Sequence, residues 1–154
     1  MDYLTLKWIH ILSSTLLLGT GLGIAFFMWM AHLTRDPRQI ATTARVVVIA
    51  DALFTAPAVI VQLGSGLWLA WLLHLPLTVF WVGTALLLFF VIGICWLPVV
   101  WLQARARDLA RAAAETGMPL PPAYARVMRW WFWLGWPAFI SVIAIFWLMV
   151  NKPI

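Results

Sequence analysis

The chain has 154 residues, of which 65% are hydrophobic and 10% are charged, with twelve Trp and a formal net charge of +5. A soluble domain of this length is about half apolar, so the composition excludes an ordinary soluble enzyme. The basic charge does not indicate nucleic-acid binding, because the Arg residues flank apolar runs and are not interleaved with exposed aromatic residues. The composition is that of an integral membrane protein whose partner is the lipid bilayer.

Four hydrophobic runs cover most of the chain, over residues 4–33, 46–73, 79–103 and 130–150. Each run exceeds the ~20 apolar residues that cross ~30 Å of hydrocarbon as a helix. Backbone polar groups in lipid must be satisfied internally, so the runs are expected to be helical. The first run is longer than a secretory signal and is predicted to be retained. The sequence therefore predicts an all-α fold, an antiparallel four-helix membrane bundle that forms one domain over residues 1–154.

The Arg residues gather in the segments that follow the first and third runs. These residues are Arg35, Arg38, Arg45, Arg105, Arg107, Arg111, Arg126 and Arg129. Segment 74–78, between the second and third runs, contains neither Lys nor Arg. The positive-inside rule then places both Arg-rich segments in the cytoplasm and both termini outside.

The connecting segments carry signals for helix ends. Pro37 follows Asp36 and is a plausible helix start. The third helix is predicted to continue through residues 105–115, where Arg111 and Glu115 are spaced i, i+4, and to end at Gly117. The link between the second and third runs is so short that these runs are predicted to form a tight antiparallel hairpin.

His10 lies inside the first run, about six residues or ~9 Å from its outer end. Ionisable groups at such depth usually face the bundle interior. A neutral imidazole can be an axial haem ligand, or it can carry protons for a quinone site. The structural alternative is a histidine that bonds across the bundle to a hydroxyl or a carbonyl group.

Small residues are predicted at the same depth as His10. Ser13 and Ser14 follow it on nearly the same face, and either could hold the second imidazole nitrogen of a metal-bound histidine. Gly64 and Gly66 of the second run, with Ala70, Gly83, Thr84, Ala85, Ser141 and Ala144, complete the layer. This layer favours close helix packing, and it is also compatible with a pocket for a flat macrocycle.

A second polar stripe follows one face of the second run, with increments of four and three residues. Its members are Asp51, Thr55, Ala58, Gln62, Ser65, Gly66 and Leu69. We expect this face to point into the bundle. Asp51 could pair with Arg45 or another loop Arg, or it could admit protons or contact a polar ligand. Gln62 is expected to form an interhelical hydrogen bond.

Two further residues are conceivable second iron ligands, because His74 and Met149 lie toward the same membrane face as His10. Neither spacing is specific. The chain contains no CxxCH, HExxH, Walker or GxGxxG pattern. The absence of these motifs excludes c-type haem attachment, zinc peptidases and nucleotide hydrolases as interpretations of the sequence.

The chain resembles the bacterial family of predicted integral membrane proteins known as domain of unknown function 2269. The resemblance rests on stretches spread over nearly the whole sequence, beginning at His10, Gly19, Phe54, Cys95, Arg107, Gly135 and Leu148. It implies a multi-pass protein of the bacterial cytoplasmic (inner) membrane. The family description carries no activity.

More distantly the chain resembles the HemJ-type membrane protoporphyrinogen oxidases. The matching features are His10 early in the first span, Pro57-Ala58 followed by a glycine, and the closing Lys152-Pro153. The lysine of that group early in the third span is absent, and Gly135-Trp136 replaces its Asn-Glu. The resemblance implies haem b at His10 and possible oxidoreductase activity on a porphyrinogen.

Three functions are compatible with the sequence. The first is a protein that binds haem b or another tetrapyrrole and acts in membrane redox chemistry. A tetrapyrrole or a quinone is the expected small-molecule partner. The second is a non-enzymatic membrane subunit or assembly partner in which His10 is structural. The third is a small transporter that works as an oligomer. Gly-rich and Trp-rich faces predict a homo-oligomer in each case.

Overall fold

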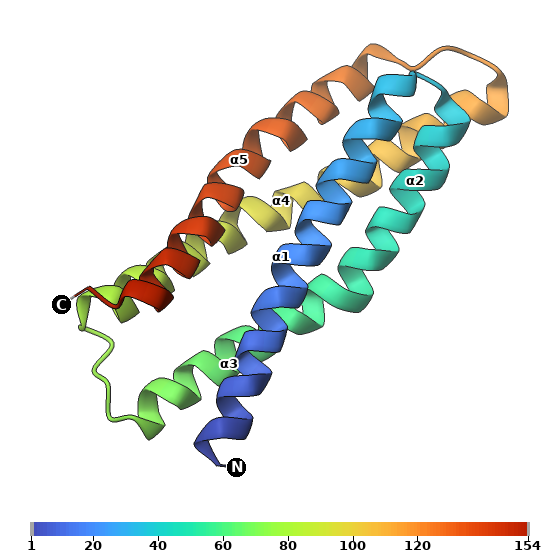
Figure 1. Ribbon diagram of the computed structural model, residues 1–154. Coiled ribbons are helices and arrows are strands. Elements are labelled where there is room, and N and C mark those ends of the chain that lie inside the picture. Colours follow the sequence, from blue (N-terminus) through green and yellow to red (C-terminus); the bar gives the residue numbers. More distant parts are fainter. Residues whose placement is uncertain (1, 154) are drawn as a thin grey trace.

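The computed structural model describes residues 2–153, which form long helices joined by short loops (Figure 1). In chain order these are α1 (Tyr3–Thr34), α2 (Pro37–Ala50), the π-helix η1 (Asp51–Thr55), α3 (Ala56–Leu72), α4 (Phe80–Thr116) and α5 (Pro122–Asn151). Because α2, η1 and α3 follow one another without a break, they form one rod, and the described residues contain four such rods. All four are long and apolar enough to cross a membrane, which confirms the predicted all-α, four-span fold. Met1 and Ile154, the ends of the predicted domain, lie outside the described residues.

The helices extend beyond the hydrophobic runs on one side only. The second rod begins at Pro37 rather than residue 46, α4 ends at Thr116 rather than residue 103, and α5 begins at Pro122 rather than residue 130. Local signals explain these ends. The Asp36 side chain accepts a hydrogen bond from the Arg38 N–H at 2.9 Å, and Gly117 ends α4 with φ +67°. A hydrophobic run marks the length of a helix within lipid, whereas caps determine where the helix stops.

The best-packed part of the protein is the Arg-rich end, which we define as the end that holds the links 35–36 and 117–121. Here α2 contacts α4, and α1 and α5 complete the core. Ala44 of α2 and Ala106 and Ala110 of α4 are fully buried, with an exposure of 0%. Small side chains let two helix backbones approach closely, which accounts for the contact.

The two halves of the bundle separate toward the opposite end, the terminal end, which holds both termini and the link 73–79 (Figure 1). Along this part α1 packs on α3, while α4 packs on α5. The prediction of a tight hairpin between the second and third runs is therefore wrong near the link. Seven extended residues span up to ~23–25 Å, so a short link does not force its helices together.

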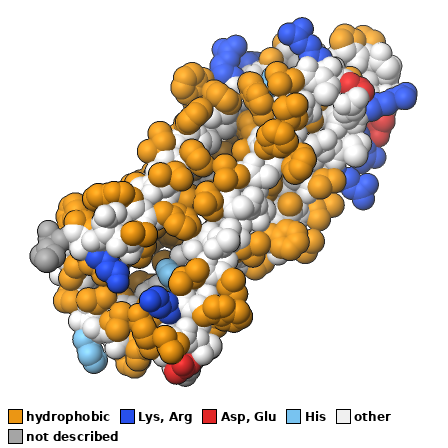
Figure 2. All heavy atoms as spheres, in the orientation of Figure 1, with side chains coloured by type: hydrophobic (Ala, Val, Ile, Leu, Met, Phe, Trp, Pro, Cys, Tyr) orange, Lys and Arg blue, Asp and Glu red, His pale blue; other side chains and the backbone are white. Residues whose placement is uncertain are grey.

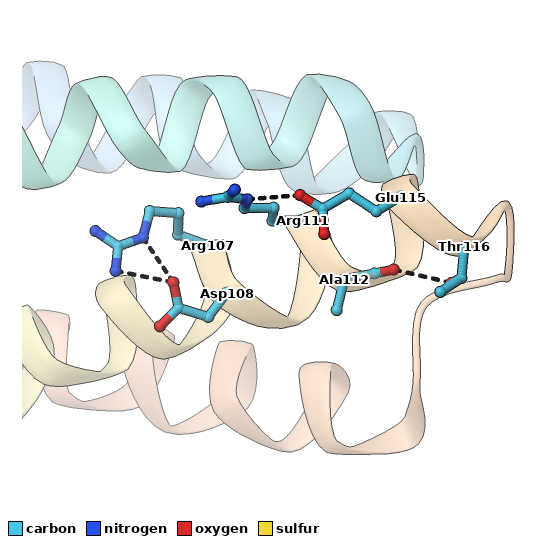
Figure 3. A network of polar contacts seen from close by, with 6 residues as sticks. All are labelled: Arg107, Asp108, Arg111, Ala112, Glu115 and Thr116. Atoms are coloured by element: carbon cyan, nitrogen blue, oxygen red, sulfur yellow. Dashed lines mark hydrogen bonds and ion pairs between the residues drawn. The ribbon is translucent and has the colours of Figure 1, made fainter.

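On the face drawn in Figure 2, the charged side chains lie at the two ends of the molecule, and hydrophobic side chains cover the flank between them. On α4, Arg107 pairs with Asp108 at 2.8 Å and Arg111 pairs with Glu115 at 2.7 Å (Figure 3). The second pair confirms the predicted i, i+4 contact. Such exposed pairs add little stability but keep this part of α4 soluble beyond the bilayer.

Candidate functional site

His10 is held by a hydrogen-bond network between α1 and α3. Its Nδ1 lies 2.9 Å from the Ser65 Oγ and its Nε2 lies 3.1 Å from the Gln62 Nε2. The Ser65 hydroxyl donates to the Val61 carbonyl at 2.6 Å, so its oxygen is free to accept from Nδ1–H. Nε2 then accepts from the Gln62 amide, whose oxygen accepts from the Ser13 hydroxyl. One neutral tautomer of His10 satisfies every contact, as the structural alternative requires.

Gly66 packs directly against the imidazole. A Cβ added at Gly66 would lie 3.0 Å from the His10 Cε1, which is closer than side chains normally approach. Gly64, by contrast, is exposed on another face of α3, and a Cβ added there would meet nothing within 4 Å. The structure therefore brings Gly66 to His10, as predicted, and places Gly64 away from it. Two helical residues that are two positions apart lie on different faces.

Neither predicted serine contacts the imidazole nitrogens. Ser13 is buried and bonds to Gln62 and to the backbone carbonyl of His10, and the Ser14 hydroxyl donates to the Ile11 carbonyl at 2.8 Å. The partners of the ring come instead from α3. The sequence did contain the signal, because Gln62 and Ser65 belong to the stripe predicted to face inward.

The predicted layer of small residues does not close around His10. Ala85 of α4 and Ser141 of α5 are buried, but their helices pack on each other, on the far side of the gap between the two halves. Depth along the membrane predicts which residues share a layer. It does not predict which helices are neighbours within that layer.

A cleft of about 500 Å³ lies where the two halves separate, and all four rods contribute to its lining. Its walls are almost entirely apolar and include many aromatic side chains, among them Trp29, Phe89 and Phe132. Leu22 and Phe26 of α1 and Trp136 and Phe139 of α5 line the cleft and are also exposed. The mouth therefore lies between α1 and α5, on the hydrophobic flank that faces lipid.

The polar residues of the cleft are concentrated in its buried floor. Asp51, Thr55, Gln103 and Trp131 all line the cleft and are 1–7% exposed. The Asp51 Oδ2, Thr55 Oγ1, Gln103 Oε1 and Trp131 Nε1 atoms have no hydrogen-bond partner within residues 2–153. A buried polar atom without a partner typically costs about 1–3 kcal/mol, so a cluster of four calls for an explanation.

Asp51 is positioned by the π-helix and by a tryptophan. It is the first residue of η1 and Thr55 is the last, and single π turns inside α-helices are frequent at functional sites. The Trp96 Nε1–H donates to the Asp51 Oδ1 at 3.3 Å, which leaves Oδ2 as the unpartnered oxygen of this carboxyl. The predicted pairing of Asp51 with Arg45 or a loop Arg is wrong. The ion pairs within residues 2–153 are those of Arg107 and Arg111.

The sequence predicted the part of the floor that comes from the second rod and missed the part that comes from α4 and α5. The stripe of the second run does face inward, since Asp51, Thr55, Ala58 and Ser65 are buried. Gln103 and Trp131 were not identified as cleft residues. A signal exists for Gln103, because it lies seven residues after Trp96 and so on the same face of α4. However, Gln103 stands at the end of an apolar run, where a polar residue is ordinary and does not by itself indicate a site.

In this arrangement His10 does not fit the role of an axial ligand to iron. Both ring nitrogens are engaged, and binding of iron at Nε2 would break the bond to Gln62. No group of three or more His, Cys, Asp or Glu within the described part of the chain could hold a metal ion. Of the predicted second ligands, His74 is exposed in the link 73–79, and Met149 is half-buried on α5.

Comparison with known proteins gives a family but no activity. The family model described as "Predicted integral membrane protein (DUF2269)" matches residues 4–153. Searches of curated proteins and of solved structures found no match. The more distant resemblance to HemJ-type enzymes therefore stays a prediction. Since the family model covers almost the whole chain, this protein belongs to the DUF2269 family of predicted integral membrane proteins.

Proposed function

We propose that this protein binds a flat, apolar molecule dissolved in the membrane, a quinone or a tetrapyrrole, in the cleft between its two halves. The observation that carries the proposal is the combination of a lipid-facing mouth, aromatic walls and a buried floor with four unpartnered polar atoms. Small-molecule sites are typically apolar clefts of ~300–1,000 Å³ in which a few polar groups fix the orientation of the ligand. A cleft of about 500 Å³ lies within this range.

The two parts of the cleft have separate roles in this proposal. Aromatic side chains such as Trp29 and Phe132 offer ring faces to a planar ligand, and stacked or edge-on aromatic pairs add attraction beyond burial alone. The floor at Asp51 and Gln103 supplies the polar contacts of the ligand head. A ligand of this class links the protein to membrane redox chemistry, because quinones and tetrapyrroles carry electrons or are oxidised in the bilayer.

His10 has a structural role in the proposal, joining α1 to α3 next to the cleft. Its satisfied hydrogen-bond network supports this role and also suits the alternative of a non-enzymatic membrane subunit. Haem b bound at His10 remains a separate prediction with its own test. We expect that protein expressed with ample haem shows no Soret band, or a Soret band that His10→Ala leaves unchanged. A Soret band lost in His10→Ala would move the ligand site from the cleft to His10.

The cleft can be tested by filling it. Gly93 of α4 lines the cleft, and a Cβ added there would meet nothing within 4 Å, so Gly93→Phe should place its ring in the open space. Gly64→Phe is the matched control, because Gly64 is exposed outside the cleft with equally open surroundings. Binding is measured as the partition of a decyl benzoquinone or of protoporphyrin between empty nanodiscs and nanodiscs that contain the protein.

We expect wild-type protein and Gly64→Phe to retain at least one of the two probes and Gly93→Phe to lose it. Retention of only one probe identifies the ligand class. The proposal fails if neither probe is enriched in nanodiscs that contain wild-type protein. It also fails if Gly93→Phe binds as well as the control.

A further inference from the structure

We propose that the cleft floor recognises a hydroxyl-bearing aromatic head, that of a reduced quinone, and binds it in preference to the oxidised quinone. This inference rests on the proposed function and specifies its ligand. The site consists of Asp51 and Thr55 on η1, Gln103 on α4 and Trp131 on α5. Each of these side chains is more than nine-tenths buried and has a polar atom without a partner in the described residues.

The acidic group of the floor selects against anionic heads. Asp51 is the only ionisable residue of the cleft lining, and no Lys or Arg within residues 2–153 pairs with it. A phosphate or a carboxylate on the ligand would bring a second acidic group to this carboxyl in a poorly solvated site. This disfavours phospholipids and the propionate groups of porphyrins. It favours a neutral head.

The hydrogen-bonding capacity of the floor distinguishes the two redox forms. The Gln103 Oε1 is a carbonyl oxygen and can only accept, so it needs a donor from the ligand. The Asp51 Oδ2 also accepts when the carboxyl is ionised, whereas the Trp131 Nε1–H can only donate. The carbonyl oxygens of an oxidised quinone satisfy Trp131 and leave Gln103 without a partner. The hydroxyls of a hydroquinone can donate to Gln103 or Asp51 and accept from Trp131.

The same contacts predict how a single atom change alters the preference. Because the Trp96 Nε1–H holds the Asp51 Oδ1 at 3.3 Å, an asparagine would keep its oxygen at that position. Asp51→Asn would then put an N–H₂ group where Oδ2 now lies. When the carboxyl is ionised, the substitution changes an acceptor into a donor at constant size. A donor at this place favours the carbonyl oxygen of the oxidised form.

The experiment compares both forms of one probe under anaerobic conditions. A decyl benzoquinone and its hydroquinone are partitioned between empty nanodiscs and nanodiscs that contain the full chain. We expect the wild-type protein to bind the hydroquinone about tenfold more tightly than the quinone, because the oxidised form leaves the buried Gln103 Oε1 unpaired. Asp51→Asn and Gln103→Leu should abolish or reverse this preference. Gly64→Phe is the control, because Gly64 is exposed outside the cleft and a Cβ added there would meet nothing within 4 Å.

Equal binding of the two forms by wild-type protein would overturn the inference, and so would a preference for the oxidised form. An unchanged preference in Asp51→Asn would do the same, and this variant decides the question if Gln103→Leu does not fold. Failure of the proposed function looks different. In that case neither form is enriched, or Gly93→Phe binds both forms as well as wild type does.

Discussion

Gly66→Ala tests the contact that joins α1 to α3 at His10. The new Cβ would lie 3.0 Å from the His10 Cε1, whereas carbon atoms prefer a separation of ~3.5–4.0 Å. The ring must then move by roughly 0.5 Å. Its two hydrogen bonds, now 2.9 and 3.1 Å, would lengthen to about 3.4–3.6 Å if the ring retreats along them, where little bonding remains. We expect overpacking to destabilise the protein by about 1–3 kcal/mol.

Gly64→Ala is the matched control on the same helix. Its Cβ meets nothing within 4 Å, so only the helix propensity changes, which favours Ala by roughly 0.5–1 kcal/mol in soluble helices. The assay is reversible unfolding in mixed detergent micelles, followed by circular dichroism. In a His10→Ala background the ring is gone, so Gly66→Ala should no longer destabilise, and a double-mutant cycle isolates the clash. If both glycines tolerate alanine equally in the wild-type background, the α1–α3 register described here is wrong.

Three further predictions concern other parts of the structure. Gln62→Leu removes the two hydrogen bonds that Gln62 makes to α1 and should lower stability by roughly 0.6–2 kcal/mol without preventing membrane insertion; unchanged unfolding would contradict the network. Gly83→Ala puts a Cβ 2.7 Å from the Leu77 carbonyl oxygen and should cost about 1–3 kcal/mol in the same assay, whereas a neutral effect would contradict the path of the link 73–79. Reporter fusions at the C-terminus and near Glu115 should report opposite compartments, outside and cytoplasm respectively; a cytoplasmic signal from the C-terminus would reverse the orientation.

The sequence alone determined the properties that depend on composition along the chain. Hydrophobic length predicted four membrane helices, Gly117 and the proline of segment 36–37 predicted helix ends, and the spacing of Arg111 and Glu115 predicted their ion pair. Periodicity also predicted which face of the second rod points inward. Each of these properties is local, because it depends on residues within a few turns of one another.

Only the tertiary structure decided which helices are neighbours at each level. The short link 73–79 suggested a hairpin, yet the buried alanines of α2 and α4 join those helices at the Arg-rich end and leave α3 and α4 apart. That separation gives His10 its partners from α3 alone. It also brings Asp51, Gln103 and Trp131 together in the floor of a cleft, although they lie on three different rods. An apolar helix face can pack against lipid as favourably as against another helix, so the hydrophobic pattern cannot specify these contacts. Small residues and buried polar groups specify them, and their effect depends on the partner that the fold supplies.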